Sequence, residues 1–221
     1  MFMIDDELLT SGELSRIRVL LGAGRFIDGR STNPHNNTKV SHIADMSDPL
    51  MREASDIAAA AIQRSLMARN YAMPTCVAYP SAVRYGPGGQ YGAHTDAAFM
   101  NIAGRPMRSD VSCTIFISDP ASYAGGELVT YLGSEAVSIK GAAGAAVFYP
   151  STTLHQVNPV LSGERLVMLT FIQSLVADAD RRDVLFWLEE VRAREGLKMD
   201  WTSRVRLSYV RENLMRMWAA S

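Results

Sequence analysis

The chain has 221 residues, of which 48% are hydrophobic and 20% charged, and its formal net charge at pH 7 is −1. This composition is typical of a globular protein, and the length suits one domain with a full hydrophobic core. The balanced charge favours neither nucleic acid nor a membrane surface as a partner. No segment approaches the roughly 18 consecutive apolar residues of a membrane helix.

The N-terminal segment carries two acids and no basic stretch before an apolar run, so it does not resemble a secretion signal. The two cysteines, Cys76 and Cys113, lack the CxxC spacing of thiol redox motifs and indicate no disulfide framework. We therefore expect a cytoplasmic protein.

Two helices are predicted ahead of the first strand. Residues 10–13, TSGE, have the spacing of a capping box, which predicts a short amphipathic helix ending near Gly22. Asp48 followed by Pro49 is typical of a helix start. It predicts a second helix that runs to about Arg69, with one apolar face formed by Ala54, Ala58, Ile62 and Leu66.

The middle of the chain changes to β character. Short β-branched or aromatic runs, separated by Gly, Pro, Ser and Asp, predict a sandwich or barrel rather than alternating βαβ units. These runs are residues 76–85, 110–118, 127–132, 136–140, 144–150, 153–160 and 165–174. Within residues 110–118, alternation places an apolar set (Cys113, Ile115, Ile117) on one face and Ser112, Thr114 and Phe116 on the other, near a cavity.

Helical periodicity returns from about Ala177 and predicts two helices that pack as a hairpin on the barrel. We therefore divide the chain into residues 1–176, with the N-terminal helices and the β domain, and residues 177–221, a C-terminal helical extension. These helices could also serve as an interface in a homo-oligomer.

Two of the four histidines fall inside the β region. His94 lies near its start and His155 near its end. His35 and His42 lie in the aperiodic segment 28–47, a predicted loop or irregular strand, where we expect surface polar residues. A buried strand histidine is more often a core residue than a metal ligand.

His94 and Asp96 are two positions apart in the segment YGAHTDAAFM. In an extended segment such positions point to the same side, so the two side chains can offer adjacent ligands to a divalent metal. An HxD pair alone is more often a hydrogen-bonded turn. With His155 as a third ligand, the set becomes the two-histidine, one-carboxylate triad that holds Fe(II) and leaves adjacent coordination positions open.

Arg165 lies ten residues after His155, and a turn at residues 161–163 would return it antiparallel beside the histidine strand. A buried arginine needs a partner, because an unpaired buried charge is strongly disfavoured. That partner is either an internal carboxylate or a dicarboxylate ligand, which would use the guanidinium fork better.

Several segments resemble the Fe(II)/2-oxoglutarate-dependent dioxygenases of the prolyl-4-hydroxylase-like branch, and specifically the bacterial PKHD-type hydroxylases. They are residues 84–96 (RYGPGGQYGAHTD), residues 108–129, residues 148–174 and the helical stretch RRDVLFWLEE. The similarity covers nearly the full chain.

The resemblance implies a mainly β fold, a double-stranded β-helix or jelly roll, with N-terminal helices and a C-terminal helical extension. By the same resemblance, His94, Asp96 and His155 bind Fe(II), and Arg165 pairs with the distal carboxylate of 2-oxoglutarate. Tyr85 matches a tyrosine that hydrogen-bonds that carboxylate, although a core aromatic role is equally compatible with its sequence context.

The implied activity is hydroxylation of a substrate coupled to oxidative decarboxylation of 2-oxoglutarate to succinate and CO2. The implied cofactor is Fe(II), with ascorbate as a further one, and the implied cosubstrates are 2-oxoglutarate and O2. The hydroxylated substrate would be a small molecule or a protein. The alternative is a non-catalytic cupin-like metal-binding or sensing domain, which would not need Arg165.

One position departs from the family pattern. Some prolyl hydroxylases have a second tyrosine on the strand after the HxD pair, whereas this chain has Phe116, which cannot donate a hydrogen bond. Thr114 or Ser112 could replace it. Residues 97–110 are long and contain glycine, which makes them either part of a substrate lid or an ordinary surface loop. We also expect the small residues Gly92, Ala93 and Ala97 to leave room for cosubstrate and oxygen beside the metal.

Overall fold

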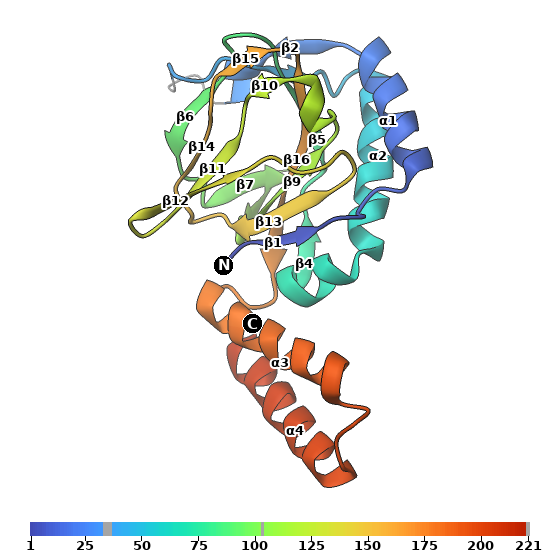
Figure 1. Ribbon diagram of the computed structural model, residues 1–221, viewed down its shortest axis with the longest axis vertical. Helices are drawn as coiled ribbons and strands as arrows, with labels where there is room; N and C mark the ends of the chain where they lie inside the picture. Colours follow the sequence, from blue (N-terminus) through green and yellow to red (C-terminus); the bar gives the residue numbers. More distant parts are fainter. Residues whose placement is uncertain (33–36, 103, 220–221) are drawn as a thin grey trace.

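Two antiparallel sheets form the centre of the molecule (Figure 1), in a computed structural model that describes residues 1–32, 37–102 and 104–219. In spatial order, the larger sheet contains β1 (Met3–Asp5), β13 (Ala146–Pro150), β9 (Val111–Phe116), β16 (Arg165–Ser174), β5 (Ser81–Tyr85), β3 (His42–Ala44) and β2 (Phe26–Asp28), with β4 (Pro74–Val77) also paired to β16. The smaller sheet contains β12 (Glu135–Ile139), β11 (Leu128–Leu132), β14 (His155–Val157) and β6 (Tyr91–His94).

Two strand pairs stand outside these sheets. They are β7 (Phe99–Ile102) with β8 (Arg105–Arg108), and β10 (Ala124–Gly125) with β15 (Val160–Ser162). The longer helices are α1 (Ser11–Ala23), α2 (Pro49–Arg64), α3 (Ala179–Glu195) and α4 (Trp201–Trp218). Short helical turns are η1 (Gly29–Thr32), η2 (Ala68–Ala72) and η3 (Pro120–Ser122).

The two main parts of the hydrophobic core lie on opposite faces of the larger sheet. On the outer face, α1 and α2 lie side by side against the sheet and bury residues such as Ile17, Ala58 and Ile115. On the inner face, side chains of the two sheets meet, with Val83 and Val167 from the larger sheet and Leu128 from the smaller one. The result is the predicted jelly roll, mainly β with flanking helices.

The two N-terminal helices form where the sequence predicts them, but α2 is shorter than expected. Thr10 and Glu13 form the capping box of α1. Helix α2 begins after the Asp48 cap and ends at Arg64, because Ser65 is extended and its Oγ donates a hydrogen bond to Asp5 at 2.6 Å. Leu66 is consequently 66% exposed and does not continue the apolar face.

The predicted β runs are confirmed in part. Residues 76–85 form two strands, β4 and β5, because the chain leaves the ladder near Pro80, which has no N–H to donate. Residues 153–160 divide between β14 and β15, whereas residues 165–174 form one strand, β16. The alternation of β9 is as predicted, since Cys113 packs under the helices and Phe116 packs between the sheets.

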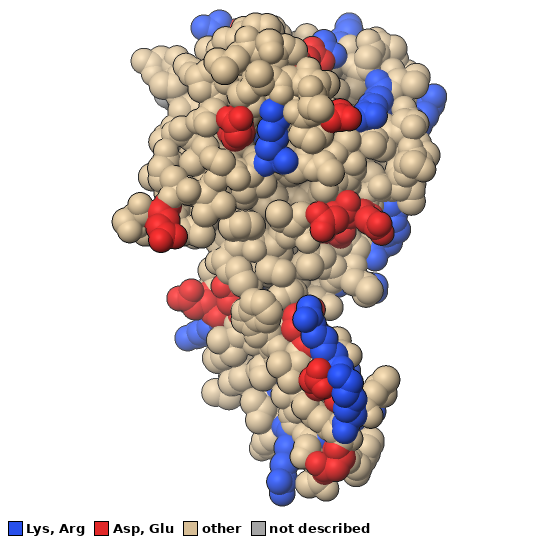
Figure 2. All heavy atoms as spheres, viewed as in Figure 1, with Lys and Arg blue, Asp and Glu red and all other residues tan. Residues whose placement is uncertain are grey.

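The C-terminal helices α3 and α4 pair with each other and project away from the sheets (Figure 1). Phe186 and Arg182, in the first half of α3, attach the pair: the Phe186 ring contacts Tyr71 edge-on, and Arg182 donates to the carbonyl of Asp110. Basic and acidic side chains lie beside one another along the projecting helices (Figure 2), as in the ion pair of Arg194 with Glu190. The boundary at residues 176 and 177 stays a prediction.

Among the described helices, none combines the length and the apolar character that crossing a bilayer would require. His42 is exposed on β3, as expected, and His35 lies outside the described residues.

Candidate metal and cosubstrate site

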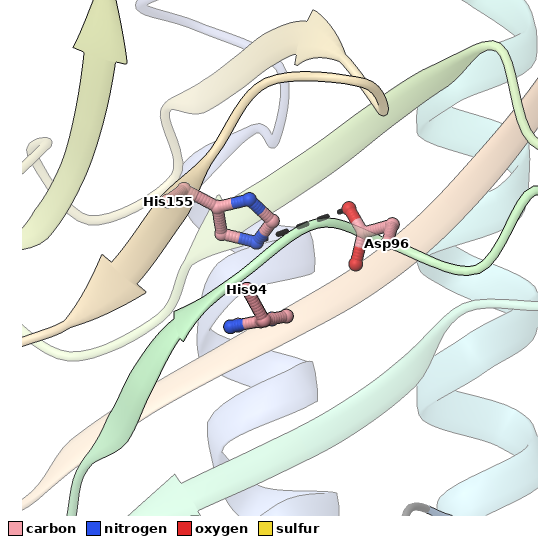
Figure 3. Close-up of side chains that lie close together, drawn as sticks. All are labelled: His94, Asp96 and His155. Atoms are coloured by element: carbon pink, nitrogen blue, oxygen red, sulfur yellow. Dashed lines mark ion pairs between the residues drawn. The ribbon is translucent and has the colours of Figure 1, made fainter.

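The smaller sheet brings together three potential metal ligands that are far apart in sequence. His94 ends β6 and His155 begins β14, and these antiparallel strands pair with the two histidines directly opposite each other. Asp96 follows two residues after His94, and its carboxylate faces the imidazole of His155 (Figure 3), with 3.8 Å between Oδ2 and Nε2. One ligand atom from each of the three residues lies within 4.8 Å of the others.

Backbone carbonyls fix the orientation of both imidazoles. Nδ1 of His94 lies 2.7 Å from the carbonyl of Gly92, and Nδ1 of His155 lies 2.9 Å from the carbonyl of Thr153. Because a carbonyl can only accept, each Nδ1 carries a proton, and in the neutral tautomer with this proton Nε2 has the free lone pair. This is the arrangement in which a histidine binds a metal through Nε2.

The local electrostatics also favour the ligand form of the imidazole. Burial lowers the pKa of His94, and the neighbouring His155 lowers it further. The ring centroids of the two histidines are 4.3 Å apart. Only a neutral imidazole offers a lone pair to a metal, so these surroundings keep His94 ready to bind one at neutral pH.

A chain of buried hydroxyl groups holds the carboxylate. Ser112, on the hydroxyl-bearing face of β9, donates to Oδ2 of Asp96 at 2.5 Å. Its Oγ also lies 2.8 Å from that of Ser151, which in turn accepts from Ser109. The sequence indicated Ser112 as a residue near a cavity, but Ser109 and Ser151 carried no recognisable signal because their contacts join separate strands and loops.

The five predicted site residues line one cavity of about 330 Å³. They are the three potential metal ligands His94, Asp96 and His155, together with Arg165 and Tyr85. The cavity lies at the lower end of the size range of small-molecule sites. Two imidazoles and one carboxylate, with open space beside them, fit the donor set of a non-haem Fe(II) centre.

Arg165 reaches the cavity from the opposite sheet, so the predicted pairing of its strand with the histidine strand is wrong. After β14 the chain forms β15, turns at Gly163 (φ 73°) and crosses to the larger sheet. There β16 pairs with β5, and Arg165 lies directly opposite Tyr85. The guanidinium carbon is 5.0 Å from the centre of the Tyr85 ring.

Arg165 is almost fully buried, at 1% exposure, and its Nε has no hydrogen-bond partner. Within the described parts of the chain, the ion pairs do not include Arg165. The internal carboxylate that was one of two expected partners is therefore not present among these residues. A buried guanidinium without a carboxylate partner suits an acidic ligand in the cavity.

Phe116 occupies the position where some prolyl hydroxylases have a second tyrosine, and Thr114 or Ser112 was the expected replacement for that tyrosine. Phe116 does not line the cavity but packs against Gly141, where even a Cβ atom would lie 2.4 Å from its ring. Thr114 lines the cavity, whereas Ser112 is engaged by Asp96. Tyr149 is a cavity residue that the sequence reasoning missed; its ring lies 5.1 Å from that of His155.

Within the segment expected to be a lid or a surface loop, β7 and β8 pair as antiparallel strands. Met100 lines the cavity and Phe99 is 62% exposed, which places this hairpin beside the cavity entrance. Its action as a lid stays a prediction.

Comparisons with known proteins agree with this geometry. Residues 80–173 match the family model of the 2OG-Fe(II) oxygenase superfamily. A PKHD-type hydroxylase of Sphingopyxis alaskensis is 41% identical over 212 residues, which cover 96% of this chain and 97% of the relative. One of Thioalkalivibrio sulfidiphilus is 39% identical over 224 residues and covers 99% of both chains.

Solved structures share the fold at low sequence identity. A viral collagen prolyl hydroxylase from Paramecium bursaria Chlorella virus-1, in complex with 2-oxoglutarate, has a TM-score of 0.53 at 18% identity, covering 78% of this chain and 95% of the other. A Trichoplax adhaerens prolyl hydroxylase in complex with a hypoxia inducible factor peptide has a TM-score of 0.56 at 17% identity, covering 83% and 86%.

The match to full-length relatives, together with the triad of donors in the jelly-roll cavity, establishes both family and reaction class. The chain belongs to the PKHD-type hydroxylases of the 2OG-Fe(II) oxygenase superfamily and is an Fe(II)- and 2-oxoglutarate-dependent dioxygenase.

Proposed function

We propose that His94, Asp96 and His155 hold the Fe(II) of this hydroxylase, and that Arg165 and Tyr85 bind the distal carboxylate of 2-oxoglutarate. The observation that carries the proposal is the shared cavity: the three metal donors and a buried guanidinium that forms no ion pair with a described residue line one space of about 330 Å³. A dicarboxylate that spans from the metal donors to Arg165 would satisfy both.

Fe(II), with 2-oxoglutarate and O2, supplies the oxidising power that hydroxylates a substrate C–H bond while 2-oxoglutarate becomes succinate and CO2. The protein's residues prepare the site for this chemistry. The carbonyls of Gly92 and Thr153 orient the two imidazoles, and Ser112 orients the Asp96 carboxylate. Because these supports are buried or backbone groups, the donors need little reorganisation when the metal binds.

Arg165 and Tyr85 select and position the cosubstrate. The guanidinium offers two parallel N–H donors that match a carboxylate, and the Tyr85 hydroxyl offers a third donor beside it. Burial raises the pKa of Tyr85, so its hydroxyl stays protonated and able to donate. The apolar side chains around the pair, such as Val83 and Val167, strengthen these charged hydrogen bonds by excluding water.

Oxygen-dependent release of succinate from 2-oxoglutarate tests the proposal. The iron-loaded protein should release succinate, and Arg165→Met should need a much higher concentration of 2-oxoglutarate for the same rate. A protein that binds iron but releases no succinate would instead support the cupin-like binding domain. The substrate whose C–H bond is hydroxylated is a small molecule or a protein.

A further inference from the structure

A lysine from the N-terminal region stands at the metal side of the cavity. The segment around Lys39 lies along the edge of β6, where Val40 and Gln90 exchange two backbone hydrogen bonds of 2.9 and 3.0 Å. On the other side of Lys39, the Thr38 hydroxyl accepts a hydrogen bond from the amide of Gly92 at 3.1 Å. The backbone of Lys39 is thus fastened on both sides.

Gly92 is required for this attachment, which corrects its expected role. A Cβ atom at position 92 would lie 2.5 Å from Oγ1 of Thr38. The missing side chain therefore leaves room for the Lys39 segment rather than for cosubstrate and oxygen. The close approach of this segment is what carries Lys39 to the wall of the cavity.

The ammonium group of Lys39 lies one aromatic ring away from a proposed metal ligand. Nζ is 5.0 Å from the centre of the Tyr91 ring and donates to Oγ1 of Thr32 at 2.6 Å. The Tyr91 ring stacks on the imidazole of His94, with 3.6 Å between ring centroids. Asp96 is near enough to raise the pKa of Lys39, against a larger lowering by burial.

In the described part of the chain, the Lys39 charge has no carboxylate of its own, since the ion pairs there do not include Lys39. Asp96 is near enough to act on this charge, but its carboxylate is the proposed ligand of a divalent cation and already accepts from Ser112. A partly buried ammonium that shares this acidic neighbour with a dication favours another anion.

Arg165 and Lys39 stand in different walls of the cavity, so we do not assign the anion that Arg165 binds to Lys39. Arg165 enters from β16 of the larger sheet, whereas Lys39 enters from the β6 edge of the smaller sheet. The proposed function assigns the distal carboxylate of 2-oxoglutarate to Arg165. Lys39 is left as a second cationic position in the cavity, on the side of the proposed metal donors.

We propose that Lys39 binds a carboxylate of the hydroxylated substrate, and that this substrate is a small organic acid. The inference rests on the proposed function. The cavity of about 330 Å³ must also hold 2-oxoglutarate, and the limited space beside the metal favours a small molecule. An ammonium group recognises a carboxylate through a charge-assisted hydrogen bond and would not retain a neutral or cationic substrate in this place.

Acetate provides a direct probe, because it is the smallest member of this chemical class other than formate. We would load the full chain with Zn(II), an inert surrogate for iron, and one equivalent of 2-oxoglutarate. Acetate and its neutral counterpart acetamide would then be titrated while the backbone amide resonances of Tyr91 and Gly92 are followed by NMR. Acetate should shift these resonances in a saturable manner, and acetamide should not.

The variants separate charge at this position from general effects. In Lys39→Met, acetate binding should weaken by about tenfold or more, as expected when one charge-assisted hydrogen bond is lost, and Lys39→Arg should retain it. Lys140→Met is the matched control, because Lys140 also lies over a tyrosine ring but does not line the cavity. It should bind acetate as the wild type does.

Three results would overturn the inference: equal acetate binding in Lys39→Met, equal shifts with acetamide, or no saturable shift in the wild type. Weaker binding of 2-oxoglutarate, rather than acetate, in Lys39→Met would assign Lys39 to the cosubstrate and also overturn it. The same samples report separately on the proposed function, since Zn(II) and 2-oxoglutarate binding are measured before acetate is added. A wild-type protein that binds no Zn(II), or no 2-oxoglutarate after Zn(II), would contradict the proposed function itself.

Discussion

The jelly roll and the C-terminal hairpin are built from the same chain but bury their residues very differently. Every residue of β9 and of β13 is buried, and charged and hydroxyl groups are buried with them around the cavity. Helix α4, by contrast, buries none of its 18 residues. The comparison indicates that the geometry of the site depends on the paired sheets, and that the hairpin can change without altering the metal donors.

The proposed metal ligands should give the largest effect of any substitution. Asp96→Asn replaces the anionic carboxylate ligand with a neutral amide, and His155→Ala removes one of the three donors. We therefore expect iron binding and succinate release to fall below detection while the fold persists. His42→Ala is the matched control, because His42 is an exposed histidine on β3 that lies outside the cavity. Iron content and succinate release measured on the same preparations check this prediction, and retained iron with normal turnover in Asp96→Asn would contradict it.

Arg165→Lys keeps a positive charge in the cavity but loses the fork that matches a carboxylate. We expect the KM for 2-oxoglutarate to rise by about 10- to 100-fold, with iron affinity nearly unchanged. Steady-state kinetics with varied 2-oxoglutarate provide the measurement. A fall in kcat with unchanged KM would argue against a role in cosubstrate binding. The midpoint of thermal unfolding serves as the control for damage to the buried site.

Ser112→Ala should weaken iron binding without abolishing it. Removing the hydroxyl that orients Asp96 is expected to lower metal affinity by about 10- to 100-fold, the range found for residues that hold metal ligands in place. Ser109→Ala, which removes a hydroxyl that contacts Ser151 but not Asp96, should have a smaller effect. Competition with a metal chelator measures both affinities, and an equal loss in the two variants would refute the ordering.

The C-terminal helices α3 and α4 offer the sharpest contrast with the jelly roll. Leu214 packs against a small cluster of Met73, Val176 and Leu185, which joins these helices to the rest of the chain. Leu214→Asp should destabilise the hairpin by about 1–3 kcal/mol, seen as faster amide hydrogen exchange in α3 and α4. Iron affinity and the KM for 2-oxoglutarate should not change. A changed iron affinity would show that the barrel and the hairpin are coupled after all.

The smallest effect concerns acid stability at the N-terminal helices. Hydrogen bonds from Arg64 hold the pKa of Glu13 at about 2, well below its ordinary value of 4.5. Because the pKa is depressed in the folded state, the ionised group stabilises the fold above pH 4.5, and this contribution is lost as the pH falls toward 2. Glu13 and Arg64 are partly exposed, so solvent screening limits the contribution to less than about 1 kcal/mol.

Denaturant unfolding between pH 7 and pH 2.5 checks this effect. Glu13→Gln should be slightly less stable than the wild type at pH 7, and the difference should shrink at pH 2.5. A difference that stays constant over this range would show that the carboxylate charge is not responsible. Iron affinity at neutral pH should be the same in both proteins.

Local sequence signals predicted much of this architecture because local physics determines it. The capping box at Thr10 and Glu13 and the alternation of β9 depend only on neighbouring residues, and both are confirmed. The HxD spacing likewise needs one extended segment. The pairing of His155 with His94 could be anticipated only through the family resemblance, because the two residues are 61 positions apart in the sequence.

The features that sequence reasoning missed depend on contacts between distant segments. The strand of Arg165 was expected beside that of His155, but the turn at Gly163 packs against Ser122 and carries the chain to the other sheet. Lys39 carried no pattern at all, since its place in the cavity depends on an edge contact with Gly92. Such positions follow from close packing, which spacing alone does not encode.

If His94, Asp96 and His155 hold iron in a cavity where 2-oxoglutarate also binds, the two ligands should meet at one centre. Anaerobic addition of Fe(II) and 2-oxoglutarate, followed by visible absorption, measures this meeting. We expect a metal-to-ligand charge-transfer band that saturates at about one iron per chain, is absent in His94→Ala and is unchanged in His42→Ala. An iron-loaded wild type without the band, or a His94→Ala variant that retains it, would show that these residues do not form the iron and 2-oxoglutarate site.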